Sequence, residues 1–183
     1  MRKQIIFLTV FSLLIMQNTN ADSLFEDNFQ EPGQWKFISD NVMGGLSTGS
    51  IAYEMKEGQS IAYLSGDVTT ENNGGFIQFR RNLKEIDLQE ANYVKITAKG
   101  NGEKYHIFIQ TTIFYRLPTG YQITSFDTSP EWETVEIPFN SFKNLKDNKN
   151  SNIDAKDIKT FGIVAYGRDF KSDLSVSSVE FYY

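Results

Sequence analysis

Cysteine is absent from the 183 residues, and histidine occurs once, as His106. Without cysteine the chain forms no disulfides, offers no thiol nucleophile and cannot carry a lipid on a cysteine. Zinc sites built from cysteine or from several histidines are excluded as well. No Gly-Lys-Ser/Thr phosphate loop and no dinucleotide fingerprint occur either. The sequence therefore predicts no catalytic residues, no cofactor and no metal ligands.

A Ser-His-Asp triad would have to use His106, and the position of this residue argues against that role. It lies between Tyr105 and Ile107 in an alternating run, where a side chain points across a sheet face. We expect a histidine that meets water or a ligand on that face. A hydrolase or lyase with paired carboxylates stays open, because 23 acidic residues can bring two to a suitable distance. A structural Ca²⁺ also stays open, although no set of oxygen ligands stands out.

Long apolar runs are lacking after residue 16. The run Ile5–Met16 has 12 residues, too few for an ordinary membrane span of about 20. It follows Arg2-Lys3 and precedes Thr19-Asn20-Ala21, a small-residue pattern typical of signal peptidase cleavage. We expect residues 1–21 to be a secretory signal peptide cleaved after about Ala21, with an uncleaved anchor as the alternative. Residues 22–183 are then one periplasmic or secreted domain without an integral membrane segment.

Basic residues are in the minority, with 18 Lys and Arg against 23 Asp and Glu and a net charge of −5. Loss of Arg2 and Lys3 with the signal peptide makes the net charge −7. An acidic domain repels nucleic acid and anionic lipid. We therefore expect no nucleic-acid partner.

Helical periodicity is missing too, whereas period-2 runs bounded by turn residues recur along the chain. The clearest pair, Tyr93–Lys99 and Lys104–Thr112, flanks Gly100-Asn101-Gly102, whose residues suit a tight hairpin. Further strands are expected at Ser60–Asp67, Gly75–Arg81, Tyr121–Asp127, Trp132–Pro138, Thr160–Tyr166 and Leu174–Tyr182. The polar stretch Lys143–Asp157 is expected to be a surface loop with one helical turn near Asp154–Ile158. The pattern predicts an all-β fold of two packed antiparallel sheets.

Paired glycines mark two informative segments. In the first, an aromatic run passes into Asp40-Asn41-Val42-Met43-Gly44-Gly45-Leu46-Ser47, and in the second a strand breaks at Asn72-Asn73-Gly74-Gly75 before Phe76. Paired glycines permit backbone conformations or close approaches that a Cβ would block. We expect Gly74 and Gly75 to be structurally required at the turn that enters the strand Phe76–Arg81.

These segments, followed by Lys99-Gly100-Asn101-Gly102 and by Trp132 through Ile137-Pro138-Phe139 to Phe142, resemble the complex I intermediate-associated protein 30 family. The resemblance runs from about Phe25 to Phe181. It implies a galactose-binding-like jelly-roll β-sandwich, similar to some carbohydrate-binding modules. It also implies an assembly-factor or chaperone role without enzymatic activity, as in the mitochondrial members that serve respiratory complex I. The expected signal peptide departs from those members, because it indicates export rather than mitochondrial import.

Two binding functions follow from these observations. The first is a protein-interaction or assembly module that uses a sandwich face and the loops with Asp40, Asn41, Asn72 and Asn73. The second is a carbohydrate-binding module that uses the concave sheet face. The mixed faces of two strands would supply its aromatic and polar groups: Phe76, Gln78, Arg80, His106, Phe108 and Gln110.

The opposite faces of the same strands are more apolar and are expected in the core. Burying the mixed faces would leave Gln78, Arg80, His106 and Gln110 in need of partners, so we expect these faces to be open. Arg80 is then an exposed anchor for an acidic or hydroxyl-bearing ligand, and Asp40–Ser47 forms the rim. The identity of the partner and the oligomeric state have no signal in the sequence.

Overall fold

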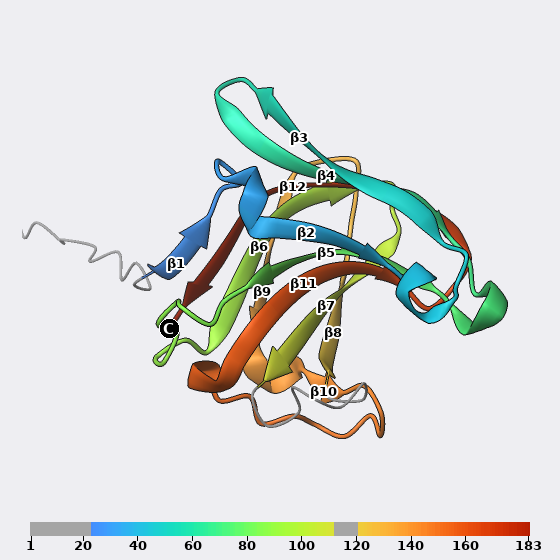
Figure 1. The fold of residues 1–183 in the computed structure, drawn as a ribbon. Coiled ribbons are helices and arrows are strands. Elements are labelled where there is room, and N and C mark those ends of the chain that lie inside the picture. Colours follow the sequence, from blue (N-terminus) through green and yellow to red (C-terminus); the bar gives the residue numbers. More distant parts are fainter. Residues whose placement is uncertain (1–22, 112–120) are drawn as a thin grey trace, which may run out of the picture.

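Two antiparallel sheets of six strands each make up the computed structural model, which describes residues 23–111 and 121–183 (Figure 1). Sheet A has the order β3-β4-β12-β6-β9, with β1 paired to β12; sheet B has the order β10-β8-β7-β11-β5-β2. The strands of sheet A are β1 (Ser23–Asp27), β3 (Thr48–Lys56), β4 (Gln59–Val68), β6 (Tyr93–Gly100), β9 (Glu133–Pro138) and β12 (Phe170–Tyr182). Those of sheet B are β2 (Trp35–Ser39), β5 (Phe76–Asn82), β7 (Lys104–Thr111), β8 (Tyr121–Asp127), β10 (Lys143–Asn144) and β11 (Ile158–Tyr166).

Short 3₁₀ turns connect some of these strands, and within the described ranges no longer helix occurs. They are η1 (Pro32–Gln34), η2 (Asp40–Met43), η3 (Glu71–Asn73), η5 (Phe139–Ser141) and η6 (Ala155–Asp157). No helix in this part of the chain is long and apolar enough to cross a bilayer. The predicted all-β sandwich is confirmed, and the signal-peptide prediction for residues 1–21 lies outside the described residues.

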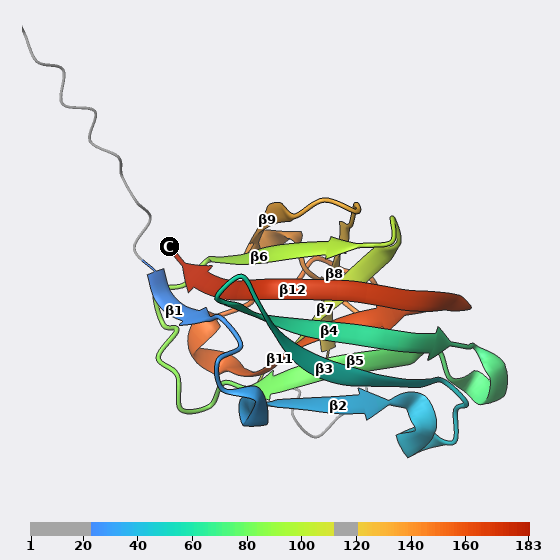
Figure 2. The same cartoon turned by 90° about the horizontal axis from the view of Figure 1, so that it is seen from above.

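Apolar residues from both sheets pack between the two layers. Figure 2 looks onto the face of sheet A, in which β9, β6, β12, β4 and β3 lie side by side and overlap strands of sheet B. Strand alternation sends Ile77 and Phe79 of β5 and Ile107 and Ile109 of β7 into this core, where all four are fully buried. The predicted core faces of these two strands are therefore confirmed. Burial of each such side chain contributes about 1.5–3 kcal/mol relative to exposure.

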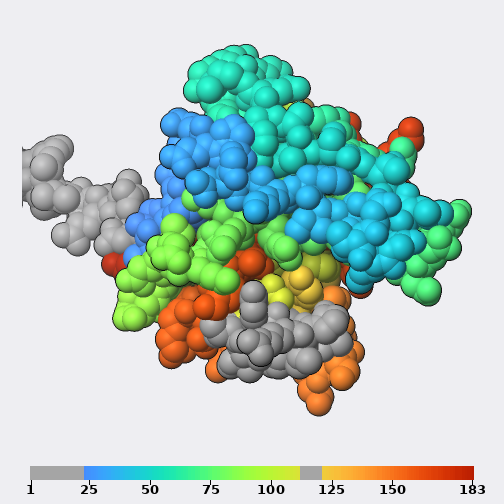
Figure 3. All heavy atoms as spheres, in the orientation of Figure 1, coloured from blue at the N-terminus to red at the C-terminus, as the bar shows by residue number. Residues whose placement is uncertain are grey.

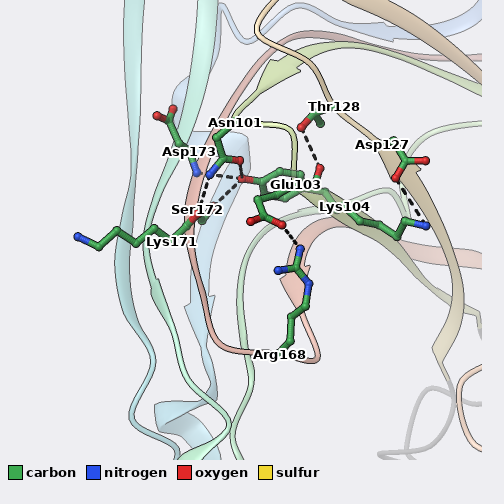
Figure 4. Close-up of polar contacts among 10 residues, drawn as sticks. Asn101, Glu103, Lys104, Asp127, Thr128, Arg168, Lys171, Ser172 and Asp173 are labelled. Carbon is green, nitrogen blue, oxygen red and sulfur yellow. Dashed lines mark hydrogen bonds and ion pairs between the residues drawn. The ribbon is translucent and has the colours of Figure 1, made fainter.

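A buried tyrosine joins the two sheets at one end of the core. The hydroxyl of Tyr105 accepts the backbone N–H of Asp173 at 2.9 Å and donates to Asn101 Oδ1 at 3.1 Å. Figure 4 shows this region, including the surface ion pairs Arg168–Glu103 and Lys104–Asp127 beside it. Because β7 and β12 belong to different sheets, these bonds fix how the sheets align.

A buried ion pair holds the other end. Asp27 at the end of β1 pairs with Arg81 of β5, and its carboxylate also accepts Trp35 Nε1–H at 2.7 Å and the Phe29 N–H at 2.8 Å. Burial lowers the pKa of Arg81. The carboxylate therefore satisfies three donors at the point where β1 joins the core.

Most expected strands are present with shifts of one to three residues at their ends, and the Gly100–Gly102 turn joins β6 and β7. Thr112, the expected end of one strand, lies outside the described residues. The loop after Phe142 is irregular apart from β10, and its helical turn is η6. The strands β1, β2 and β3 were not predicted from the sequence. The turn from β3 to β4 consists of Glu57 and Gly58, with φ of 52° and 81°.

Candidate ligand-binding groove

A groove with a volume of about 520 Å³ lies on the face of sheet B that points away from the core. We call it the groove; it is lined by Ile38, Val42, Met43, Asn73, Gly74, Phe76, Gln78, Arg80, Phe108, Tyr121, Leu145 and Tyr166. The space-filling view shows this face hollowed below the blue and cyan atoms of β2 and the loop that follows it (Figure 3). The groove lies on the sheet face that we predicted to be open. The predicted exposure is wrong for Gln78, Phe108 and Gln110, which are buried on that face.

Strand register explains why these residues meet. In the antiparallel ladder Arg80 of β5 lies opposite Gly162 of β11, and Gly162 lies opposite Phe108 of β7. Gly162 has no side chain, so it forms a low point between the arginine and the ring. A Cβ at Gly162 would lie 2.7 Å from Gln78 Oε1. The glycine therefore gives the Gln78 amide its place on the groove floor.

Aromatic rings form one wall of the groove. Phe108 contacts Tyr166 edge to face, with ring centroids 5.2 Å apart, and lies 5.5 Å from Tyr121. Tyr166 also contacts the imidazole of His106 at 5.5 Å. Each ring fixes its neighbour, so the groove presents a preformed apolar surface.

Three polar atoms on this face have no protein partner among the described residues. Gln78 Oε1, His106 Nδ1 and Thr160 Oγ1 are all buried without a hydrogen bond. Arg80, which is half-buried, donates to the hydroxyl of Tyr121 at 3.2 Å. An unpaired buried acceptor costs about 1–3 kcal/mol, and a hydroxyl or amine of a bound ligand can satisfy it.

The imidazole of His106 is held neutral. Burial lowers its pKa to about 4, and the charges of Lys104 and Arg168 add to the effect. A neutral imidazole can accept or donate a hydrogen bond to a ligand at physiological pH. His106 lies in a neighbouring hollow together with Ser125 and Lys143 rather than in the groove lining itself.

The loop after β2 forms one rim of the groove. Val42 and Met43 in this loop are 73% and 64% exposed, and both line the groove. Their exposure is large for apolar side chains in a loop that is otherwise tightly hydrogen-bonded. The rim therefore offers apolar contact to whatever enters.

Asp40 holds that rim in place and cannot touch a ligand, which corrects our prediction for this residue. Its side chain is fully buried; Oδ1 accepts the Ser47 N–H at 2.9 Å, and Oδ2 accepts the Ser47 hydroxyl and the N–H groups of Gly75 and Phe76. Burial raises the pKa of Asp40, but the hydrogen bonds from Gly75, Ser47 and Phe76 outweigh it, so the pKa lies below its usual value. The carboxylate is a structural cross-link between the two glycine-rich segments.

Asn41 has a structural role as well. Its Nδ2 donates to Ser39 Oγ at 2.7 Å and to the Ser47 carbonyl at 2.6 Å, which closes the rim loop. Asn72 and Asn73 both adopt positive φ near 58°, and Asn73 lines the groove while Asn72 does not. Of the four loop residues predicted to bind, Asn73 thus has the position that the prediction requires.

Most of the predicted binding residues on β5 and β7 lie in or beside the groove. Phe76, Gln78, Arg80 and Phe108 line the groove, and Gln110 lies beside it in a second hollow that shares Arg80. Several lining residues were not predicted from the sequence: Ile38, Val42, Met43, Tyr121, Leu145 and Tyr166. The apolar pair Val42-Met43, set between an asparagine and two glycines, was the sequence signal for the rim. The sequence contained no signal that Tyr121 and Tyr166 line the groove, because only the order of the strands in the sheet brings them beside Phe108.

Among residues 23–111 and 121–183, no Asp or Glu lines the groove, and no group of three or more His, Asp or Glu is placed to hold a metal ion. The arrangement is therefore suited to holding a ligand by ring contact, amide and guanidinium groups.

Comparison with known proteins identifies the family of the chain. The sequence matches the complex I intermediate-associated protein 30 family over residues 24–176. No curated protein sequence matches the chain.

Several solved structures with a similar fold are carbohydrate-binding modules. The family 11 module of the cellulosomal cellulase Lic26A-Cel5E of Clostridium thermocellum has a TM-score of 0.69 and 17% identity, over 88% of this chain and 94% of that module. The Clostridium thermocellum family 11 module in complex with a β-1,3-1,4-mixed-linked tetrasaccharide has a TM-score of 0.66 and 16% identity, over 88% and 97%. The family 30 module of cellulase Cel9D-Cel44B from the same organism has a TM-score of 0.51 and 13% identity, over 75% and 90%. At these identities the similarity is one of fold.

Proposed function

Because the chain belongs to the complex I intermediate-associated protein 30 family, we propose that it is an exported, non-catalytic binding module with an assembly-type role in the cell envelope. Its partner is held in the groove of sheet B. The expected signal peptide at residues 1–21 supports the location, and family membership supports the assembly or chaperone role.

The groove carries this proposal. It combines a preformed aromatic wall, an exposed apolar rim and a buried amide oxygen, Gln78 Oε1, that lacks a partner among the described residues. Exposed apolar side chains and unsatisfied buried acceptors both cost free energy in the unbound protein. A partner that covers Val42 and Met43 and donates a hydrogen bond to Gln78 Oε1 removes both unfavourable contributions, which stabilises the complex.

The surroundings of His106 among the described residues are those of a residue that contacts rings rather than of a catalytic base. His106 contacts the ring of Tyr166, and its Nδ1 has no hydrogen bond from a described residue. A catalytic base needs a nucleophile within hydrogen-bond reach and a third group to orient it. Among the described residues, no hydrogen bond joins the His106 side chain to a nucleophile or to a group that would orient it.

A second candidate function is carbohydrate binding, and one observation favours it. The groove sets Phe108 and Tyr166 beside the Gln78 amide and the Arg80 guanidinium, which together offer a ring for stacking and groups for sugar hydroxyls. In this case the ligand is a glycan of the envelope or of the surroundings.

Capture from the native envelope separates the two candidates. The purified protein and its Tyr166→Ala variant are immobilised, and retained material is identified with and without free glycans as competitors. We expect Tyr166→Ala to lose the retained material. Retention of a protein that sugars do not displace supports the assembly role, whereas displacement by sugar supports carbohydrate binding. Equal retention by both forms contradicts the groove as the binding surface.

A further inference from the structure

Charge is distributed unevenly on this protein. The chain has a net charge of −5, yet no Asp or Glu among the described residues lines the groove or the adjoining hollow. The adjoining hollow, which we call the basic hollow, has a volume of about 240 Å³ and is lined by Gln34, Lys36, Arg80, Asn82, Lys84, Gln110 and Thr160. Among the described residues, the cations Lys36 and Arg80 therefore border one concave region whose lining contains no Asp or Glu.

These two cations lie side by side. Lys36 of β2 is the register partner of Arg80 of β5, so both side chains leave the same face of sheet B. No carboxylate of the described residues lies within 4.0 Å of either charged group. The next residue, Arg81, has its own carboxylate in Asp27 on the opposite face.

Like charges placed together in a concavity repel each other, and low-dielectric walls strengthen the field there. The hydroxyl of Tyr121 is a neutral partner for Arg80 and leaves its charge uncompensated. An anionic ligand removes this repulsion, and the planar guanidinium fork matches a carboxylate or sulfate.

The other groups that line the groove indicate which kind of molecule bears the negative charge. Phe76, Phe108 and Tyr166 offer ring faces and edges, and Gln78 Oε1 accepts a hydrogen bond from a hydroxyl. A ligand that meets these groups has saturated rings with hydroxyls, together with a negative charge.

We propose that the groove and the basic hollow together bind an anionic glycan, with its acidic group against Arg80 and Lys36 and a sugar ring on Tyr166. This inference rests on the groove being the binding surface of the proposed function. It selects a glycan over a protein partner and an acidic glycan over a neutral one.

Titration calorimetry of the purified protein tests this at low salt. The probes are oligomers of galacturonate and of mannuronate, fully methyl-esterified oligogalacturonate, dextran sulfate and a polyglutamate peptide. We expect at least tenfold tighter binding of an acidic oligosaccharide than of the esterified one, and weaker binding as salt rises. If dextran sulfate binds as tightly as the uronic acid oligomers, negative charge in general is recognised. If the uronic acid oligomers bind more tightly, the carboxylate is recognised.

Variants locate the contact. Arg80→Ala is expected to weaken binding of the acidic glycan about tenfold. The affinity of Arg80→Lys should lie between those of Arg80→Ala and the unaltered protein, and Lys36→Ala should weaken binding several-fold. Lys171→Ala is the matched control, because Lys171 is an exposed cation on β12 of sheet A. Its affinity should equal that of the unaltered protein.

The failures are distinguishable. Equal binding of acidic and esterified glycans overturns the anionic inference but leaves carbohydrate binding in the groove. Binding of polyglutamate without any glycan overturns it in favour of a protein partner at the same surface. Absence of binding to every probe overturns the inference. The proposed function fails too if, in the capture experiment, Tyr166→Ala retains as much envelope material as the unaltered protein does.

Discussion

The carboxylate of Asp40 accepts the backbone N–H of Gly75, which lies 35 residues further along the chain. This bond joins the rim loop after β2 to the turn before β5, and both border the groove. Gly45 and Gly74 lie so close to the carboxylate that a Cβ on either would come within 2.4 Å of an atom of it. The two glycine-rich segments are thus one structural unit built around a buried charge.

Asp40→Asn should destabilise the protein by about 2–3 kcal/mol. The amide nitrogen that replaces one oxygen cannot accept the N–H groups now bonded to the carboxylate, and the charge that strengthens these bonds is lost. Urea denaturation gives the free energy of unfolding. Asp67→Asn is the control, because Asp67 is exposed and its ion pair with Lys171 is long, at 3.9 Å. Equal stability of the two variants would contradict the role of Asp40.

Gly74→Ala and Gly75→Ala should each cost about 1–3 kcal/mol, for different reasons. At Gly74 an added Cβ meets Asp40 Oδ2 at 2.4 Å, whereas Gly75 has room but a φ of +124°. Combination with Asp40→Ala separates the causes: the cost of Gly74→Ala should shrink, and that of Gly75→Ala should remain. Gly33→Ala is the control, because a Cβ there meets no atom within 4 Å. Unchanged denaturation midpoints for both glycine variants would show that neither constraint matters.

The neighbouring arginines of β5 should respond in opposite ways to truncation. Arg81→Ala leaves the Asp27 carboxylate buried without its cation and should cost about 3–5 kcal/mol. Arg80→Ala removes one hydrogen bond to Tyr121 and should change the free energy of unfolding by less than about 1 kcal/mol. Thermal and urea unfolding measure both. A large loss of stability for Arg80→Ala would make Arg80 a structural residue and remove it from the binding surface.

Acid should weaken the fold through His106. Its pKa is about 4 in the folded protein and 6.5 as the ordinary value, so between these pH values the unfolded chain binds a proton that the folded protein does not. The free energy of unfolding therefore falls as the pH drops from about 6.5 to 4, by on the order of 2 kcal/mol from this group. His106→Gln should remove that part of the pH dependence. Parallel stability curves for the two proteins across this range would contradict the burial of a neutral imidazole.

The sequence predicted the fold class, most strands and the two faces of β5 and β7, because alternation is a local property that survives into the structure. It did not predict β3, whose nine residues are mostly exposed and so carry a weak apolar pattern. The buried role of Asp40 was also out of reach. A short acidic residue in a Gly-rich turn has the same local pattern whether it faces solvent or the N–H groups of a distant loop.

The candidate site was predictable only in part, because strand order decides which residues meet. Phe108 and Tyr166 are 58 positions apart in the sequence and become neighbours only through the pairing of β7 with β11. The same pairing places Gly162 between Arg80 and Phe108. Alternation within one strand identifies a face, whereas the groove is formed by five adjacent strands and three segments outside them.

Mapping of backbone amide chemical shifts tests the central claim most directly. The isotope-labelled protein is titrated with the ligand found by capture or calorimetry, and the perturbed amides are placed on the structure. The account predicts the largest shifts at Gly74, Gln78, Arg80, Phe108 and Tyr166, with little change around Trp132 and Lys171 of the other sheet. Shifts concentrated on sheet A, with the groove residues unaffected, would contradict it.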